Sequence, residues 1–84
     1  MHNVTREMLL DGVGVCLRHY KGTEYIVMLV TLDASTQELR VVYKPNGRQY
    51  ERTPPWDRVL SEFLELIVWP DGIERTRFVK LAGD

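Results

Sequence analysis

An alternation of apolar and polar residues constrains the fold of this chain more than any other feature of its sequence. Apolar side chains occupy every second position over residues 13–17 and again over residues 39–43. Between these runs, residues 25–32 are apolar at both parities and rich in β-branched side chains. A period of two predicts a strand with one buried face, and an unbroken apolar run is typical of a central strand. With turn residues at 21–24 and 33–36, the three runs predict an antiparallel meander.

Turn-forming residues interrupt the chain after the third predicted strand. Pro45-Asn46-Gly47 ends that strand, and residues 48–52 form either a short fourth strand or an ordered loop. Pro54-Pro55 then precedes apolar residues at helical spacing. Proline suits the entry to a helix, so we expect one or two helical turns over residues 55–63.

The last part of the chain has the pattern of a hairpin. Residues 64–69 predict a strand, Pro70-Asp71-Gly72 a tight turn, and residues 73–81 a strand that pairs back with Phe78 facing inward. Several short strands separated by turns at regular intervals are typical of a small barrel. The predicted fold is mostly β, a small SH3-like partly open barrel of five or six antiparallel strands with one short helical turn. An oligonucleotide-binding-type barrel is the alternative, although it usually needs more chain.

The composition fits one small domain. The 84 residues carry 11 Lys and Arg against 12 Asp and Glu, for a net charge of −1, and 44% of them are apolar. This balance argues against intrinsic disorder, and no apolar run reaches the roughly 18–20 residues of a membrane span. The first residues also lack the pattern of a signal peptide. We expect a cytoplasmic protein with an N-terminal extension over residues 1–11 and a single barrel domain over residues 12–84.

The N-terminal extension has the pattern of one capped helical turn. Thr5 is placed to cap a turn that carries Met8 and Leu9. Such a turn is too short to be stable alone, so its apolar side chains need a docking surface on this chain or on a neighbour. The alternative is a frayed terminus with a small packing role.

The sequence contains no recognisable catalytic constellation. A glycine-rich phosphate loop, a serine elbow and a metalloprotease helix are all absent. The single cysteine, Cys16, excludes an internal disulfide, and on a strand it would face away from His19, which argues against a catalytic pair. His2, Cys16 and His19 also lack the spacing and the fourth ligand of a closed zinc site. We therefore expect no enzyme activity, no cofactor and no metal site.

Five residues are candidates for binding a ligand, namely His19, Lys21, Tyr43, Trp56 and Arg58. An indole beside a guanidinium suits a phosphate, a carboxylate or a nucleobase. The alternative, which the sequence favours equally, is a structural role in which Trp56 covers the core as a lid and Arg58 pairs with a nearby acid. His19 beside Lys21 is either an anion contact or a hydrogen-bonded histidine at the end of a strand, and the second role is the more common.

A second group of basic residues follows the third strand. Lys44, Arg48 and Arg52 are interleaved with Tyr43 and Tyr50, and such a loop can stack bases and contact phosphates. Three charges with an acidic residue among them fit a solvated hairpin better. The net negative charge also disfavours a nucleic-acid partner.

Several short motifs occur in the order found in a known family. They are His19-Tyr20-Lys21-Gly22 with Tyr25 and Val27, Val41-Val42-Tyr43, Trp56-Asp57-Arg58, Phe63-Leu64-Glu65, Asp71-Gly72 and Arg77-Phe78. Over residues 12–81 the chain resembles a family of short bacterial proteins catalogued as domain of unknown function 1653. It departs from the family at Val59, where the family has proline. The resemblance implies a small SH3-like β domain and no known activity.

The expected function is that of a non-catalytic binding module for a small anionic or nucleotide-type ligand, held at a cleft or an oligomer interface. One small core cannot easily enclose two tryptophans, so we expect a homo-oligomer, a dimer first, that associates through Trp69, Leu66 and the Met8–Leu9 pair. Two alternatives stay open, an adaptor that binds a protein partner through an open sheet edge and a protein that binds single-stranded nucleic acid. No membrane partner is expected, because a basic amphipathic helix and a lipidation signal are absent.

Overall fold

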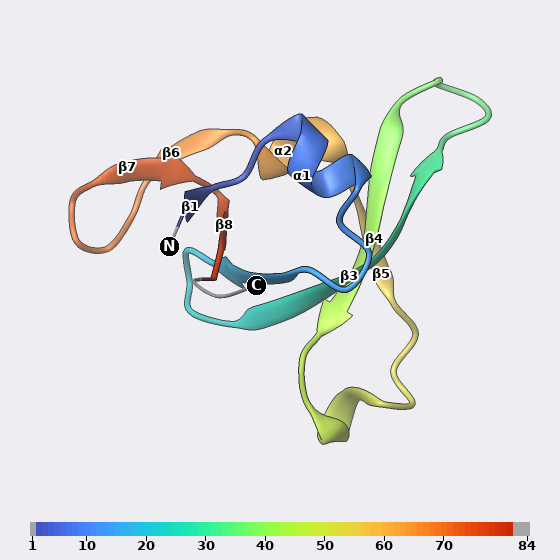
Figure 1. The fold of residues 1–84 in the computed structure, drawn as a ribbon, viewed down its shortest axis with the longest axis horizontal. Coiled ribbons are helices and arrows are strands. Elements are labelled where there is room, and N and C mark those ends of the chain that lie inside the picture. The colour runs from blue at the N-terminus through green and yellow to red at the C-terminus, as the bar shows by residue number, and fades with distance from the viewer. Residues whose placement is uncertain (1, 82–84) are drawn as a thin grey trace.

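The computed structural model describes residues 2–81 as a mostly β fold with short helical segments (Figure 1). The elements are β1 (His2–Asn3), α1 (Arg6–Leu10), β2 (Cys16–His19), β3 (Glu24–Leu32), β4 (Leu39–Pro45), a 3-10 helix (Arg48–Tyr50), β5 (Trp56–Val59), α2 (Leu60–Phe63), β6 (Leu66–Val68), β7 (Glu74–Thr76) and β8 (Phe78–Lys80). Within these residues, neither helix has the length and apolar character needed to cross a membrane.

Six strands form one antiparallel sheet in the order β1-β8-β2-β3-β4-β5, and β6 and β7 form a separate hairpin. The sheet does not close, so β1 and β5 are left as its two edges. This arrangement confirms the predicted mostly β, partly open fold, and β2, β3 and β4 are the expected meander. In Figure 1, α1 and α2 lie next to each other above the curved sheet.

A β-bulge in β3 explains its unusual apolar pattern. Pairing with β4 shifts register between Val27 and Leu29, and the extra residue reverses which parity faces the core. Val27 is buried before the bulge, and Val30 packs against the core after it. Met28 and Leu29 are left exposed. The strand is therefore central in the sheet but covered on one face only.

The core lies between the concave side of the sheet and the two helices. Its members are Val4, Leu9, Leu17, Val27, Val41, Tyr43, Leu60, Phe63 and Phe78. Phe63 of α2 stacks on Phe78 of β8 with ring centroids 4.3 Å apart. The inward orientation predicted for Phe78 is therefore confirmed, and the stack joins the short helix to the last strand of the sheet.

The N-terminal extension packs onto the same core. The hydroxyl of Thr5 accepts a hydrogen bond from the backbone N–H of Met8, as the predicted cap requires. Leu9 is only 1% exposed. The docking surface for this helical turn is thus on this chain. The division of the chain at residue 11 itself stays a prediction.

The helix expected over residues 55–63 is wrong in its first half. Residues Trp56–Val59 are extended and pair with β4, from Tyr43↔Trp56 to Arg40↔Val59, and only Leu60–Phe63 is helical. A strand pair satisfies the backbone of this segment better than an isolated helical turn would, because short helices nucleate poorly. Residues 48–52 take the loop alternative, with a 3-10 turn at Arg48–Tyr50.

Two predicted strands also differ in extent. The first begins at Cys16, and Val13 before it is exposed. The last divides into β7, which pairs with β6, and β8, which crosses to the large sheet between β2 and β1. The predicted hairpin turn is present, with Gly72 at a positive φ of 85° that favours glycine.

Two residues expected on the self-association surface, Trp69 and Leu9, are buried in the fold instead. Trp69 is 7% exposed, and its indole Nε1–H donates to the backbone carbonyl of Thr76 at 2.9 Å. The indole packs across its own hairpin, where a hydrogen bond satisfies its one polar group. Leu9 is in the core, whereas Leu66 is exposed as expected.

Burial of Leu9 predicts that α1 is part of the cooperative fold. Leu9→Ala should lower the free energy of unfolding by about 2–4 kcal/mol, the usual cost of truncating a buried leucine. Leu10→Ala, next to it on the exposed side of the same helix, should cost less than about 1 kcal/mol. Urea unfolding followed by circular dichroism measures both. Equal, small losses would show that α1 is not coupled to the core.

Candidate functional site

A cleft of about 550 Å³ is bordered by β2, β3, β4, β5 and β8, and the five candidate residues all line it. His19 ends β2, Lys21 follows it in the turn, Tyr43 lies on β4, and Trp56 and Arg58 lie on β5. The remaining lining residues are Thr23, Tyr25, Asp57 and Phe78. The fold thus brings together side chains from five strands, and the role of the five candidate residues in binding a ligand stays a prediction.

Trp56 and Arg58 lie on the same face of β5. Residues two apart on a strand point to the same side, whereas in the expected helical turn they would have diverged. Trp56 is 46% exposed, and its ring centroid lies 6.0 Å from those of Tyr25 and Tyr43. The indole therefore forms an exposed aromatic wall of the cleft rather than a buried lid.

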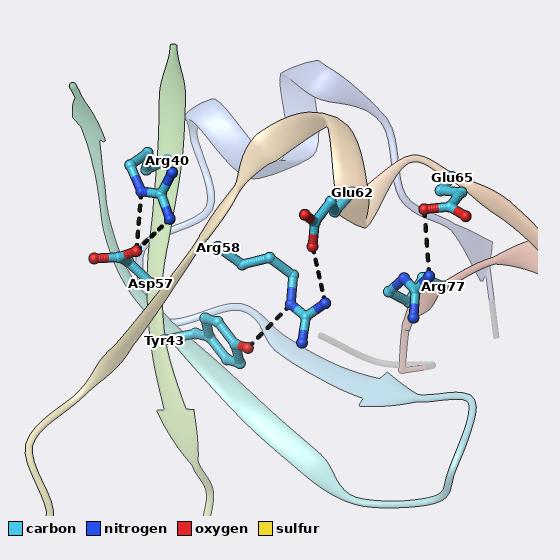
Figure 2. Close-up of polar contacts among 7 residues, drawn as sticks. All are labelled: Arg40, Tyr43, Asp57, Arg58, Glu62, Glu65 and Arg77. Atoms are coloured by element: carbon cyan, nitrogen blue, oxygen red, sulfur yellow. Dashed lines mark hydrogen bonds and ion pairs between the residues drawn. The ribbon is translucent and has the colours of Figure 1, made fainter. Parts of the chain in front are cut away.

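The Arg58 guanidinium is held in place from two sides (Figure 2). Its Nε donates to the Tyr43 hydroxyl at 3.3 Å, and its Nη1 donates to Glu62 Oε2 at 2.9 Å. The guanidinium carbon lies 6.0 Å from the ring centroid of Phe78. The hydrogen bonds that the guanidinium donates to Tyr43 and, to a smaller extent, to Glu62 raise the pKa of Arg58, so the guanidinium stays charged at this side of the cleft.

His19 is neutral at physiological pH. Burial of the ring and, after it, the positive charges of Arg58, Arg77 and Lys21 together lower its pKa to about 4. Nδ1 accepts a hydrogen bond from the backbone N–H of Lys21 at 3.3 Å. A neutral imidazole that accepts at Nδ1 carries its proton on Nε2. The ring therefore matches the hydrogen-bonded strand-end histidine, and it offers a neutral donor.

Arg58 itself pairs with Glu62, as its alternative role predicts, whereas two other acidic residues nearby are engaged by other arginines. Asp57 accepts from Nε and Nη2 of Arg40 at 2.9 and 2.6 Å, and Glu65 pairs with Arg77 at 3.3 Å (Figure 2). Lys21 has no acidic partner within ion-pair distance among residues 2–81. Among the charged residues that line the cleft, Lys21 and Arg58 outnumber Asp57, so the lining is net positive although the chain has a net charge of −1.

Sequence reasoning missed two contributors to the site. Glu62 was left without a role, although its position four residues after Arg58 is the spacing at which a helical ion pair forms. Tyr25 lines the cleft beside Tyr43, with ring centroids 5.2 Å apart. Its two-residue spacing from buried Val27 was a usable signal, because alternate residues of a strand share a face.

The other sequence candidates lie outside the cleft. Arg48 and Arg52 are exposed in the loop between β4 and β5, and Lys44 donates to the backbone carbonyl of Glu51 at 3.3 Å. Cys16 is at the far end of β2 from His19 and does not line the cleft. In the part of the chain that the structure describes, no group of three His, Cys, Asp or Glu side chains is placed to hold a metal ion.

Comparison with known proteins gives the family. Residues 16–80 match the model of a family described as "Protein of unknown function (DUF1653)". The chain belongs to the DUF1653 family. The crystal structure of a DUF1653 protein from Bordetella bronchiseptica is similar, with a TM-score of 0.68, 26% identity, and coverage of 87% of this chain and 91% of that chain. The comparison with curated proteins found no match.

The DUF1653 match spans every residue of the candidate cleft, while β1 and α1 precede it. The departure from the family pattern at Val59 is understandable from the backbone. Val59 has a φ of −59°, which is close to the angle that proline requires. The backbone angle at this junction between β5 and α2 is thus one that either valine or proline can adopt.

The low pKa of His19 predicts a pH-dependent stability. Between pH 6.5 and 4 the unfolded chain binds a proton that the folded ring does not, so stability falls as the pH is lowered through this window. His19→Gln should reduce the loss between pH 7 and 4.5 by about 1–2 kcal/mol, allowing for partial solvent exposure. Urea unfolding at several pH values measures this effect, with exposed His2→Gln as the control. The same slope in wild type and His19→Gln would contradict it.

Proposed function

We propose that the cleft binds a small ligand in which an anionic group is attached to a flat aromatic ring, as in a nucleotide, and that the protein is a non-catalytic, cytoplasmic binding module. The observation that carries this proposal is the placement of an exposed indole and a fixed guanidinium on one face of the same strand, β5. Neither side chain alone indicates such a ligand, but together they match its two parts.

The aromatic part of the ligand would stack on Trp56. Nearly half of this side chain is exposed, and Tyr25 and Tyr43 support it from behind. Stacking of a base on an aromatic side chain contributes about 1–3 kcal/mol and tolerates different bases. This contact would therefore contribute affinity without specifying one base.

The anionic part would bind Arg58 and Lys21. Within residues 2–81, Nε and Nη1 of Arg58 donate hydrogen bonds to protein acceptors, whereas Nη2 donates none and can bind a ligand. A planar guanidinium suits a phosphate or carboxylate, and the ammonium of Lys21 adds a second positive charge at the rim. His19 Nε2–H is a further donor that brings no charge.

The chemistry of His19 supports binding rather than acid–base catalysis. A general base works best when its pKa lies near the operating pH, whereas the pKa of this ring is about 4. Its Nδ1 is also occupied by the backbone N–H of Lys21.

A titration with adenosine monophosphate tests the proposed function. Wild type should bind with quenching of tryptophan fluorescence from the exposed Trp56. Arg58→Met should weaken binding about tenfold or more, since hydrogen bonds to charged groups contribute about 1.5–3 kcal/mol. Trp56→Ala should have an effect of similar size.

Arg75→Met is the matched control, because it removes the same charge from the β6–β7 hairpin, outside the cleft. Circular dichroism shows whether each variant is folded. No binding to wild type at millimolar nucleotide and low salt would refute the proposed function. Equal weakening by Arg58→Met and Arg75→Met would also refute it, because the effect would then be one of overall charge.

An adaptor function is the second candidate, favoured by the open edge of β5. A peptide that adds a strand to this edge would bond to its backbone. Reversing the charges of Lys21 and Arg58 separates the two functions. An adaptor would keep its protein partner after this change, whereas the anion-binding cleft would lose its ligand.

A further inference from the structure

The β6–β7 hairpin exposes apolar side chains on one of its strands. Leu66 and Val68 are 55% and 65% exposed, and both point to the same side of β6 because they are two residues apart. Among the described residues, β6 is hydrogen-bonded to β7 alone. The hairpin is also separate from the large sheet, at one end of the molecule in Figure 1.

The hydrogen bonds of the hairpin show which backbone groups point outward. Arg77 N–H donates to Glu65 O at one end, and Trp69 N–H donates to Ile73 O at the other. Hydrogen-bonded and non-hydrogen-bonded pairs alternate along an antiparallel ladder. Between Glu65 and Trp69, the residue whose backbone N–H and C=O point toward β7 is therefore Ile67. The N–H and C=O groups of Leu66 and Val68 must therefore point away from β7, along the free edge of β6.

The opposite edge of the hairpin is already occupied. The backbone N–H of Thr76 donates to Asn3 Oδ1 at 3.1 Å, and its carbonyl accepts from the indole of Trp69 at 2.9 Å. The N-terminal segment thus covers the outer side of β7. The two edges differ, and β6 is the one that carries outward backbone groups beside exposed apolar side chains.

We propose that β6 pairs antiparallel with β6 of a second copy of this chain, so that the two hairpins form one four-stranded sheet about a twofold axis at Ile67. In this register Leu66 of each copy faces Val68 of the other. The outward groups of these residues then form four backbone hydrogen bonds, because each hydrogen-bonded pair exchanges two. This dimer does not depend on the ligand cleft.

The edge is complementary to itself in side chains and in charge. Leu66 and Val68 of both copies would form a continuous apolar surface across the new junction. Their nearest charged neighbours on that face, the two copies of Glu74, would lie at diagonal corners about 16 Å apart by strand spacing. This separation exceeds the Debye length of about 8–10 Å at physiological ionic strength, so the pairing brings no like charges together.

A second copy fits this edge better than an unrelated peptide for a further reason. Natural edge strands avoid self-pairing by means of lysine, proline or inward charges, and residues Leu66–Val68 contain none of these. Because so few residues a side make the contact, it is smaller than a standard interface of about 20–30 residues a side. We therefore expect a weak dimer, with a dissociation constant of about 10 μM to 1 mM.

Sedimentation equilibrium from micromolar to millimolar protein tests the dimer. Val68→Pro removes an outward N–H that no residue of the hairpin uses, so the fold should survive at this edge position. This variant and Val68→Lys should each raise the dissociation constant at least tenfold. Ile73→Lys, an exposed change near the turn of the same hairpin, should leave it unchanged. A wild type that stays monomeric, or equal effects of the two lysine variants, would overturn the proposal.

A crosslinking experiment tests the register. Ile67 on the twofold axis would form a non-hydrogen-bonded pair with its own copy, with Cα atoms about 4.5 Å apart, so Ile67→Cys should form a disulfide-linked dimer under mild oxidation. Val68→Cys should not, because the Cα atoms of the two copies of residue 68 would be about 8 Å apart, too far for a disulfide. Wild type controls for crosslinks through Cys16. Equal crosslinking of the two variants would contradict the register.

Discussion

The pairing of β5 with β4 determines where the two principal side chains of the cleft point. Because Trp56 and Arg58 lie two residues apart on an extended strand, both face the rings of Tyr25, Tyr43 and Phe78. Tyr43 then has two roles, since its ring supports Trp56 and its hydroxyl accepts from Arg58. Had residues 56–59 been helical, the indole and the guanidinium would have pointed in different directions.

Local electrostatics in this protein differ from its overall charge. Asp57, on the same strand as Arg58, is held by Arg40, while Lys21 and Arg58 keep their positive charges at the cleft. Burial, together with these cations and Arg77, keeps His19 neutral. An acidic protein can therefore present a small positive site, which the net charge alone would not have suggested.

The sequence predicted those parts of the fold that depend on residues close together along the chain. The alternation over residues 13–17 and 39–43 and the glycine of the last turn identified the meander and the hairpin. The bulge in β3, the extended form of Trp56–Val59 and the burial of Trp69 depend on partners far along the chain, which periodicity does not reveal. All five predicted site residues line one cleft. They belong to the family motifs, although the helix expected over residues 55–63 would have separated Trp56 from Arg58. Glu62 was missed because its role depends on where α2 begins.

In the proposed function, the exposed indole of Trp56 and the guanidinium of Arg58 form one binding surface. Nuclear magnetic resonance tests it most directly, because the side-chain N–H signals of Trp56, Trp69 and Arg58 are separate reporters. On addition of a nucleoside monophosphate, the signals of Trp56 and Arg58 should shift and saturate together, with the signal of Trp69 unchanged. Shifts confined to the loop with Arg48 and Arg52, or none at millimolar ligand, would contradict it.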